Sequence, residues 1–386
     1  MITTAEQVEE WVRGARERGV LALDTEFVWE RTYYPRLGVV QVALSGEEAE
    51  LVDALALPHL EPLGELLSDA SVVKILHDAQ QDLTILRRAT GAYPRNVFDT
   101  RCVAGLVGVS STLSLNGVLR QTVGVELTGT ATRTDWLRRP LAARQVAYAL
   151  DDARYLPLAR ESLLARATAL GREDWVREEL ATYDDPALYD DPDPQAQFRR
   201  LKGAASLSAR ELAVLRELAA WRENEARRRD LPRRHVVPDE VLTDAAMRAP
   251  RSLPALSRVR GALDCERYGV AMLEAIARGL ALGGEALPPP VERPDDEVLG
   301  ARVDFLLSYL KGKSLSHTVD PALVASRAEL SALVREGSAA GPGDHRLLRG
   351  WRGEFVGKEL LGLLEGQDAV RLGRATGLPE LASDHP

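Results

Sequence analysis

A change in the spacing of apolar residues constrains the fold of this chain more than any other feature of its sequence. Between Val20 and about Val73, four short runs are apolar or alternate with polar residues, as β-strands do: VLALDTEF, LGVVQVAL, AELVDAL and SVVKIL. After them, apolar residues recur every three or four positions, as in amphipathic helices that cover a sheet. The pattern predicts an α/β domain of about 180 residues, a usual size for one domain.

Two breaks in the helical pattern divide the rest of the chain. The stretch Tyr183–Pro194 holds three prolines and five aspartates, so it neither continues a helix nor buries much surface. A second break, rich in proline and glycine, spans Leu282–Asp296. We therefore expect an α/β domain at residues 1–183, a linker at 184–203, a small helical domain at 204–284, a second linker at 285–297 and a second small helical domain at 298–386.

Composition excludes several classes of protein. The 386 residues carry 49 basic and 58 acidic side chains, a net charge of −9, so a chain that coats nucleic acid with a uniformly basic surface is excluded. Cys102 and Cys265 are the two cysteines, too few for a disulfide framework or a cysteine-rich zinc site. The N-terminus has no signal-peptide pattern, and no apolar stretch is long enough for a membrane span. We expect a cytoplasmic protein without a membrane partner.

Two acids stand at the end of the first apolar run. In a strand, the side chains of Asp24 and Glu26 point to one face, and Thr25 points away from them. Two carboxylates placed this way repel each other unless a cation lies between them, and sites made of oxygen ligands favour Mg²⁺ or Mn²⁺. Taken alone, the pair is better explained as the solvated end of a strand.

Further candidates lie on predicted helices. Asp82, in the segment HDAQQD, follows an apolar run and opens an amphipathic helix, where an acid either caps the helix or faces a shared cleft. Tyr148 and Asp152 are four residues apart and share one helix face. Alone, the first is a capping signal, and the pair is a hydrogen-bonded tyrosine on a helix surface.

Taken in order, these motifs resemble those of the tyrosine-type DEDD 3′→5′ exonucleases, and the sequence segments that contain and flank them resemble those of the ribonuclease D family. The matching segments are DTEF, TYYPRLGVVQ, HDAQQDL, FDTR, TDWLRRPL and YALDDARYLPL. The resemblance covers the whole chain. It implies an RNase H-like α/β exonuclease domain, with a mixed sheet flanked by helices, followed by two small all-α helical bundles.

The resemblance also implies an active site. Asp24, Glu26, Asp82 and Asp152 would be the metal ligands for two divalent ions, Mg²⁺ or Mn²⁺. Tyr148 would orient the attacking water or help to deprotonate it. Neighbouring acids do not fit the pattern: Asp151 is only three residues after Tyr148, and Asp78 does not precede the leucine of the motif. Two ions so held can stabilise both the attacking and the leaving oxygen of a phosphodiester.

Other residues match the family less decisively. Tyr33, Gln41 and Asp99 are candidates near the substrate, or else packing and turn residues. His77 is a candidate nucleic-acid contact, although a histidine at a strand exit is more often a hydrogen-bonded structural residue. Related sequences commonly carry a lysine where Gly129 stands. Arg133 and Arg138 are candidates to replace its contact with phosphate.

A local excess of positive charge predicts where nucleic acid binds. Residues 199–234 contain eleven Lys or Arg and five Asp or Glu, in a chain that is acidic overall. The alternative is a solvated helix face whose charge Glu223 and Glu225 partly neutralise. The basic residues proposed to contact phosphates are Arg227, Arg228, Arg233 and Arg234.

The helical domains resemble a known module. The segment LSARELAVLRELAAWRENEARRRDLPRR is similar to the helicase and RNase D C-terminal (HRDC) domain, and PALVASRAEL with LLRGWRGEFVGKELLGLLEG is similar to a divergent second copy. Trp221 and Trp351 could stack on bases, but their apolar neighbours favour places in the core.

The family implies a 3′→5′ exoribonuclease that hydrolyses single-stranded RNA 3′ ends and releases nucleoside 5′-monophosphates. The expected substrates are tRNA precursors and other small structured RNAs, and the expected state is a monomer. Two alternatives stay open: a 3′→5′ DNA exonuclease, and a catalytically weak nucleic-acid-binding protein. Recognition of the 2′-hydroxyl separates RNA from DNA, and no motif identifies it.

Overall fold

The computed structural model describes residues 1–127, 134–259, 261, 265–290, 297–337, 341, 343 and 345–382. These residues form two compact units. The first contains residues 1–26, 37–189 and 295–386, and the second contains residues 27–36 and 190–294. None of the described helices is long and apolar enough to cross a membrane.

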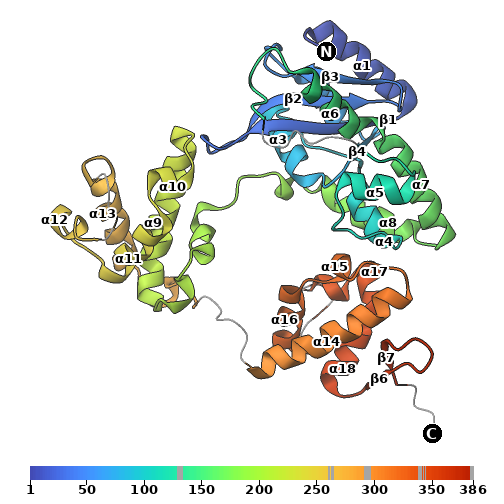
Figure 1. Cartoon of the computed structure of the whole chain (residues 1–386). Helices are drawn as coiled ribbons and strands as arrows, with labels where there is room; N and C mark the ends of the chain where they lie inside the picture. The colour runs from blue at the N-terminus through green and yellow to red at the C-terminus, as the bar shows by residue number, and fades with distance from the viewer. Residues whose placement is uncertain are drawn as a thin grey trace. The chain divides into compact units, whose positions relative to one another are not determined.

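A five-stranded mixed sheet forms the centre of the first unit, as predicted (Figure 1). The strand order is β3-β2-β1-β4-β5; β2 and β3 are antiparallel, whereas β1 and β5 each run parallel to β4. The strands are β1 Val20–Val28, β2 Arg36–Ala43, β3 Ala49–Asp53, β4 Val73–Leu76 and β5 Val97–Asp99.

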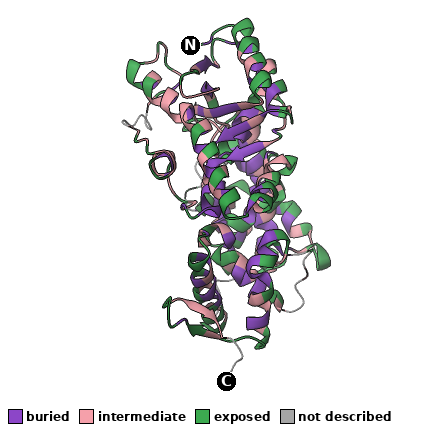
Figure 2. Ribbon diagram, turned by 90° about the vertical axis from the view of Figure 1, so that its right-hand side faces the viewer, coloured by how far each residue is buried: buried purple, intermediate pink, exposed green. Residues whose placement is uncertain are grey.

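Both faces of the sheet are buried, which explains why the first strand reads as a continuous apolar run. Leu21 and Leu23 on β1 belong to one apolar cluster, whereas Ala22 between them belongs to another. Figure 2 shows the sheet mostly in the colour of buried residues. The helices of this part are α1 Ala5–Arg18, α2 Glu61–Ser68, α3 Gln80–Thr90, α4 Thr100–Leu106, α5 Leu115–Thr122, α6 Ala143–Arg154, α7 Leu156–Ala169 and α8 Glu173–Leu180.

The C-terminal part of the chain shares a core with these helices. Leu306 and Trp351 belong to the same apolar cluster as Val103 of α4 and Val176 of α8, and Trp351 is buried, which confirms its expected place in a core. The sequence predicts a separate domain at 298–386, whereas the structure places this segment in the first unit because its apolar faces pack against α4 and α8. Its helices are α14 Glu297–Ser316, α15 Pro321–Val324, α16 Arg327–Glu336, α17 Gly350–Arg352 and α18 Lys358–Glu365, with one turn of π-helix at Gly353–Gly357.

This part is not wholly helical, which corrects the prediction of an all-α bundle. Strands β6 Val370–Leu372 and β7 Pro379–Leu381 form an antiparallel pair. Pro379 of this pair lies against α14, because its carbonyl oxygen would be 2.4 Å from a Cβ atom at Gly312. A glycine at this position therefore lets the strand pack directly on the helix.

The second unit is helical. Its core includes Leu212, Leu215 and Leu218 of α9 together with Ala275 of α13. The sequence predicts a linker at 184–203, whereas the structure folds short 3₁₀ helices there because Phe198 has apolar neighbours on α9 to pack against. The elements are 3₁₀ helices Pro194–Arg200 and Ala204–Ser206, and α9 Ala209–Arg229, α10 Arg233–Val236, α11 Asp239–Arg248, α12 Leu253–Leu256 and α13 Cys265–Ala281.

Candidate active site

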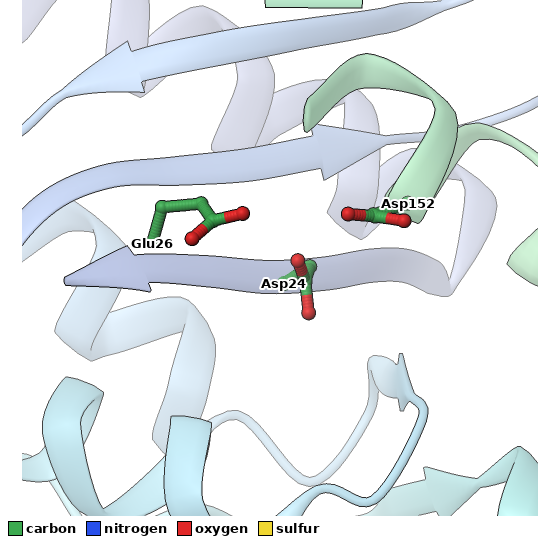
Figure 3. Close-up of side chains that lie close together, drawn as sticks. All are labelled: Asp24, Glu26 and Asp152. Carbon is green, nitrogen blue, oxygen red and sulfur yellow. The ribbon is translucent and has the colours of Figure 1, made fainter. Parts of the chain in front are cut away.

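Three of the predicted acids meet at one place in the first unit. Asp24 and Glu26 project from β1, and Asp152 projects from α6 into the same space (Figure 3). Their carboxylates each offer an oxygen, and these oxygens lie within 4.8 Å of one another. The two strand residues share a face because side chains alternate along a strand, and helix α6 supplies the third acid.

Ionising all three acids at once is unfavourable, because they are partly buried and their carboxylates repel one another. Burial, followed by repulsion from Asp82 and Asp152, raises the pKa of Asp24 well above its usual value. Burial and the charge of Asp152 raise the pKa of Glu26 to about 8, and burial raises that of Asp152 to about 6. A divalent cation would remove this repulsion, and three carboxylates form the hard oxygen site that such cations prefer.

The fourth predicted acid, Asp82, is turned toward a different partner. It lies in the first turn of α3 and accepts a short hydrogen bond from the hydroxyl of the buried Thr25. It is still near enough to raise the pKa of Asp24 and of Glu26. The group of mutually close acids thus includes three of the four predicted residues, and Asp82 borders it.

Gln41 lies beside this group and orients one of its members. The Gln41 side chain on β2 is fully buried, and its Nε2 donates to Oδ2 of Asp24 at 3.1 Å. Its Oε1 has no hydrogen-bond partner within the described ranges. A buried amide with one end bonded to a carboxylate fixes the rotamer of that carboxylate.

Tyr148 lies one turn before Asp152 on α6. Burial, the charges of Asp152 and Glu26, and a hydrogen bond to Asp152 all raise the pKa of its hydroxyl. Its ring lies 6.4 Å from that of the buried Trp136, centroid to centroid. The Trp136 segment in turn lies against β2 at Gly38, where any Cβ atom would be 2.5 Å from the Trp136 carbonyl oxygen. This glycine therefore allows the close packing that supports Tyr148.

A second layer supports the turn that leads to Asp82. Asp99 is buried at the N-cap of α4 and accepts from the backbone N–H groups of Asp78 and Ala79 at 3.0 Å each. The hydroxyl of Tyr183 donates to Asp99 at 2.5 Å. The supporting roles of Thr25 and Tyr183 were not predictable from the sequence, because nothing in their local pattern indicates partners that are tens of residues away.

His77 is held by structural hydrogen bonds. Its Nδ1 lies 3.0 Å from the Thr100 hydroxyl, and its Nε2 lies 3.2 Å from the Leu113 carbonyl oxygen. Both ring nitrogens are therefore occupied within the fold, which favours the structural interpretation over a contact with nucleic acid. Gly129 and Arg133 lie outside the residues that the structure describes.

Arg138 lies in the first unit, whereas the other predicted contacts, Tyr33 and four arginines, belong to the second. Arg233 and Arg227 pair with Glu223, at 2.8 Å and 3.1 Å, and both donate to the Tyr33 hydroxyl. Arg228 pairs with Glu225 at 2.8 Å. Three of the four arginines predicted to contact phosphates therefore pair with Glu223 or Glu225, as the alternative interpretation of a partly neutralised helix face expects. The fourth, Arg234, is exposed.

Two family models match this chain, one largely within the first unit and one within the second. A family model described as a 3′-5′ exonuclease matches residues 1–166, and one described as an HRDC domain matches residues 211–276. A ribonuclease D of Desulfotalea psychrophila is 38% identical over 361 residues, which are 92% of this chain and 96% of the relative. The chain belongs to the ribonuclease D family. Ribonuclease D enzymes are 3′→5′ exoribonucleases, which hydrolyse phosphodiester bonds.

Two further relatives support this assignment. The ribonuclease D of Escherichia coli K12 is 32% identical over 95% of this chain and 98% of its own length. The crystal structure of Escherichia coli RNase D superimposes with a TM-score of 0.84 and covers 95% of this chain and 98% of that one. The predicted fold class, a mixed-sheet exonuclease domain followed by helical segments that include an HRDC domain, is therefore confirmed. The DEDD-type exonuclease domain of ribonuclease D uses divalent metal, which the acidic cluster fits.

The raised pKa values predict that metal binding depends on pH. Protons compete with the cation for Asp152 up to about pH 6 and for Glu26 up to about pH 8. We therefore expect metal affinity to rise as the pH is raised from about 6 to about 8, with at least about one proton released per protein near neutral pH, because the pKa values of both Glu26 and Asp24 are raised. Calorimetric titration with Mg²⁺ in buffers of different ionisation enthalpy measures that release. An affinity and heat that do not change over this interval would contradict the prediction.

Proposed function

We propose that the chain removes nucleotides one at a time from the 3′ ends of single-stranded RNA and releases nucleoside 5′-monophosphates. The observation that carries the proposal is the cluster of Asp24, Glu26 and Asp152 beside Tyr148, within a ribonuclease D chain matched over nearly its full length. The RNase D of Escherichia coli is described as an exoribonuclease involved in structured RNA processing. We extend this role to the present chain, with tRNA precursors among its substrates.

The proposed cofactors are two divalent ions, Mg²⁺ or Mn²⁺, held by Asp24, Glu26, Asp82 and Asp152. When bound, two such ions stabilise the charge that develops on the attacking and leaving oxygens. The chain's own groups prepare this site. Gln41 fixes the Asp24 carboxylate, and Thr25 fixes that of Asp82.

Tyr148 would orient the attacking water through its hydroxyl, which is already hydrogen-bonded to Asp152. Replacing Tyr148 by phenylalanine removes this hydroxyl and keeps the ring beside Trp136. We expect kcat to fall roughly 10²-fold, with Mg²⁺ affinity nearly unchanged. Single-turnover cleavage of labelled RNA and a Mg²⁺ titration measure the two quantities.

Tyr155 provides a matched control, because it is a partly buried tyrosine at the C-terminal end of the same helix. Tyr155→Phe is expected to cleave at the wild-type rate. If Tyr148→Phe also did so, Tyr148 would have no part in the chemical step.

A comparison of RNA with DNA tests the substrate. Two single strands of one sequence, one with ribose and one with deoxyribose, are incubated with Mg²⁺, beside a tRNA precursor that carries a 3′ extension. We expect the RNA to be shortened faster than the DNA and the extension to be trimmed, because the 2′-hydroxyl distinguishes the two strands. Faster shortening of DNA would favour the deoxyribonuclease, and tight binding of every strand without cleavage would favour a binding protein.

The monomeric state and the cytoplasmic location expected from the sequence stay predictions. Sedimentation of the purified chain at several concentrations tests the first. The expected cytoplasmic location is consistent with precursor RNA as the proposed substrate.

A further inference from the structure

The second unit contains a pocket that the proposed chemistry does not use. The segment of residues 27–36, which begins with the last two residues of the strand bearing Asp24 and Glu26, packs against the HRDC domain in this unit. Together they line a cavity of about 570 Å³, with Trp29, Thr32 and Tyr33 on one side and the segments around α10 and the start of α11 on the other. A volume of this order is typical of sites that bind small ligands.

The backbone of the segment is fixed to the HRDC domain. Asp230, the residue that ends α9, has a positive φ of 51°. Its Oδ1 accepts from the backbone N–H groups of both Tyr33 and Tyr34, at 3.0 Å each. The Tyr34 hydroxyl donates to Asp191 at 2.9 Å. Three hydrogen bonds from two consecutive residues hold the segment in one conformation.

A buried glutamate, Glu223, holds two residues that line the pocket, Tyr33 and Arg233. Glu223 is 1% exposed and accepts from the Tyr33 hydroxyl, Arg233 and Arg227. Although burial alone would raise the pKa of Glu223, the hydrogen bonds from Arg233 and Tyr33 hold it below its usual value. Arg233 and Arg227 therefore both pair with this glutamate, whose single negative charge compensates one of their two positive charges.

Two groups at the pocket remain without such a role. Trp29 is 58% exposed, although it is the largest side chain of the segment, and its ring lies 6.2 Å from that of Phe27, centroid to centroid, in a T-shaped arrangement. Arg234 is exposed and has no acid within ion-pair distance in the described part of the chain. One exposed tryptophan on a surface needs no explanation. An exposed tryptophan and an unpaired arginine on the walls of one rigid cavity form the combination that binds a nucleotide.

The two acids that line the pocket limit what it accepts. Asp239 pairs with Arg222 at 2.6 Å, so its charge is compensated. Glu240 is exposed. A free carboxylate disfavours a second phosphate and accepts hydrogen bonds from base amino groups such as N4 of cytosine. The pocket therefore suits a single nucleotide whose base faces Trp29 and Glu240.

We propose that this pocket binds one nucleotide of the RNA strand, with its base stacked on Trp29 and its phosphate contacted by Arg234. The proposal rests on the proposed function in one respect, namely that RNA is the ligand. It adds a binding site in the HRDC domain and the preceding segment, separate from the acids that carry out hydrolysis. Stacking tolerates every base, because each has a flat π-face, which suits an enzyme that processes RNAs of different sequence.

Binding measured without cleavage tests the site. A 5′-fluorescein single-stranded RNA of about 20 nucleotides, long enough to span several binding sites of this size, is titrated with the protein in chelator, and Kd is read from anisotropy. We expect Trp29→Ala to raise Kd roughly 10-fold, and Trp29→Phe to restore most of the affinity, since a phenyl ring also stacks. Met247→Ala is the matched control, because Met247 is an exposed large apolar residue of the same unit and lies outside the pocket.

Salt dependence separates the two proposed contacts. Arg234→Ala should reduce the slope of log Kd against log salt by about 1, whereas Trp29→Ala should leave the slope unchanged. Arg248→Ala, which removes an exposed arginine that pairs with Asp244 elsewhere in the unit, should change neither affinity nor slope. If Trp29→Ala and Arg234→Ala both bound the RNA with the wild-type Kd and the wild-type slope of log Kd against log salt, and their melting temperatures were unchanged, the proposal would be overturned.

Adding Mg²⁺ to the same samples distinguishes this proposal from the proposed function. Wild-type protein that shortens the RNA, with an unchanged Kd in Trp29→Ala, would overturn the pocket alone. Wild-type protein that binds through Trp29 but leaves the RNA intact would overturn the nuclease assignment and support the pocket.

Discussion

Asp24→Asn is expected to abolish RNA hydrolysis and, in the absence of metal, to make the protein more stable. The substitution removes a carboxylate from the group that would hold the ions, and we expect kcat/KM to fall at least about 10³-fold, or about 4 kcal/mol. It also removes a carboxyl group whose ionisation is opposed by burial and by the charges of Asp82, Asp152 and Glu26. We therefore expect the melting temperature in chelator to rise by roughly 2–4 °C, equivalent to about 1 kcal/mol.

Asp151→Asn is the matched control, because Asp151 adjoins Asp152 but pairs with Arg154 at 3.4 Å instead of joining the acidic group. Its cleavage rate should equal that of the wild type. Asp24→Asn with wild-type activity, or with a lower melting temperature in chelator, would contradict the assignment of Asp24 to a strained metal site.

Glu179→Ala is expected to cause the largest loss of stability among single substitutions outside the active site. Glu179 on α8 accepts from Arg352 at 2.9 Å, from Arg346 at 2.9 Å and from the Trp351 ring N–H at 3.0 Å. Arg352 is itself buried, so removing its partner leaves an uncompensated charge within the protein. The expected loss in free energy of unfolding is about 3–5 kcal/mol, measured by urea denaturation.

Asp304→Ala is the matched control, because Asp304 pairs with Arg327 at the surface, where their side chains are 66% and 50% exposed. It should cost less than about 1 kcal/mol. Equal effects of the two substitutions would mean that the buried pair does not hold the C-terminal segment against α8.

The parts of the fold that follow from local sequence patterns were predictable. The run VLAL predicts a strand, and the sheet buries it on both faces. Strand alternation predicts that Asp24 and Glu26 share a face, and helical spacing predicts the same for Tyr148 and Asp152. The structure brings the three acids among them together. Periodicity suffices in these cases because the contacts lie within one element or between neighbouring elements.

Features that depend on distant partners were not predictable in the same way. The C-terminal helices have apolar faces that suit a core of their own, yet they complete one with α4 and α8. The short strands β6 and β7 carry too few residues for an alternating pattern to stand out. The rotamer of Asp82 depends on Thr25, which is 57 residues away. Likewise, the excess of arginines before Arg234 indicates a basic surface, although four of these arginines share two glutamates, Glu223 and Glu225, which compensate half of their charge.

The most direct test of the central claim is the direction and metal dependence of cleavage. A single-stranded RNA labelled at its 5′ end is incubated with the protein in Mg²⁺, in chelator, and in chelator followed by excess Mg²⁺. We expect a ladder of labelled products that shorten one nucleotide at a time from the 3′ end, no products in chelator, and recovery when Mg²⁺ returns. Cleavage that persists in chelator, or a labelled mononucleotide as the first product, would contradict a metal-dependent 3′→5′ exonuclease.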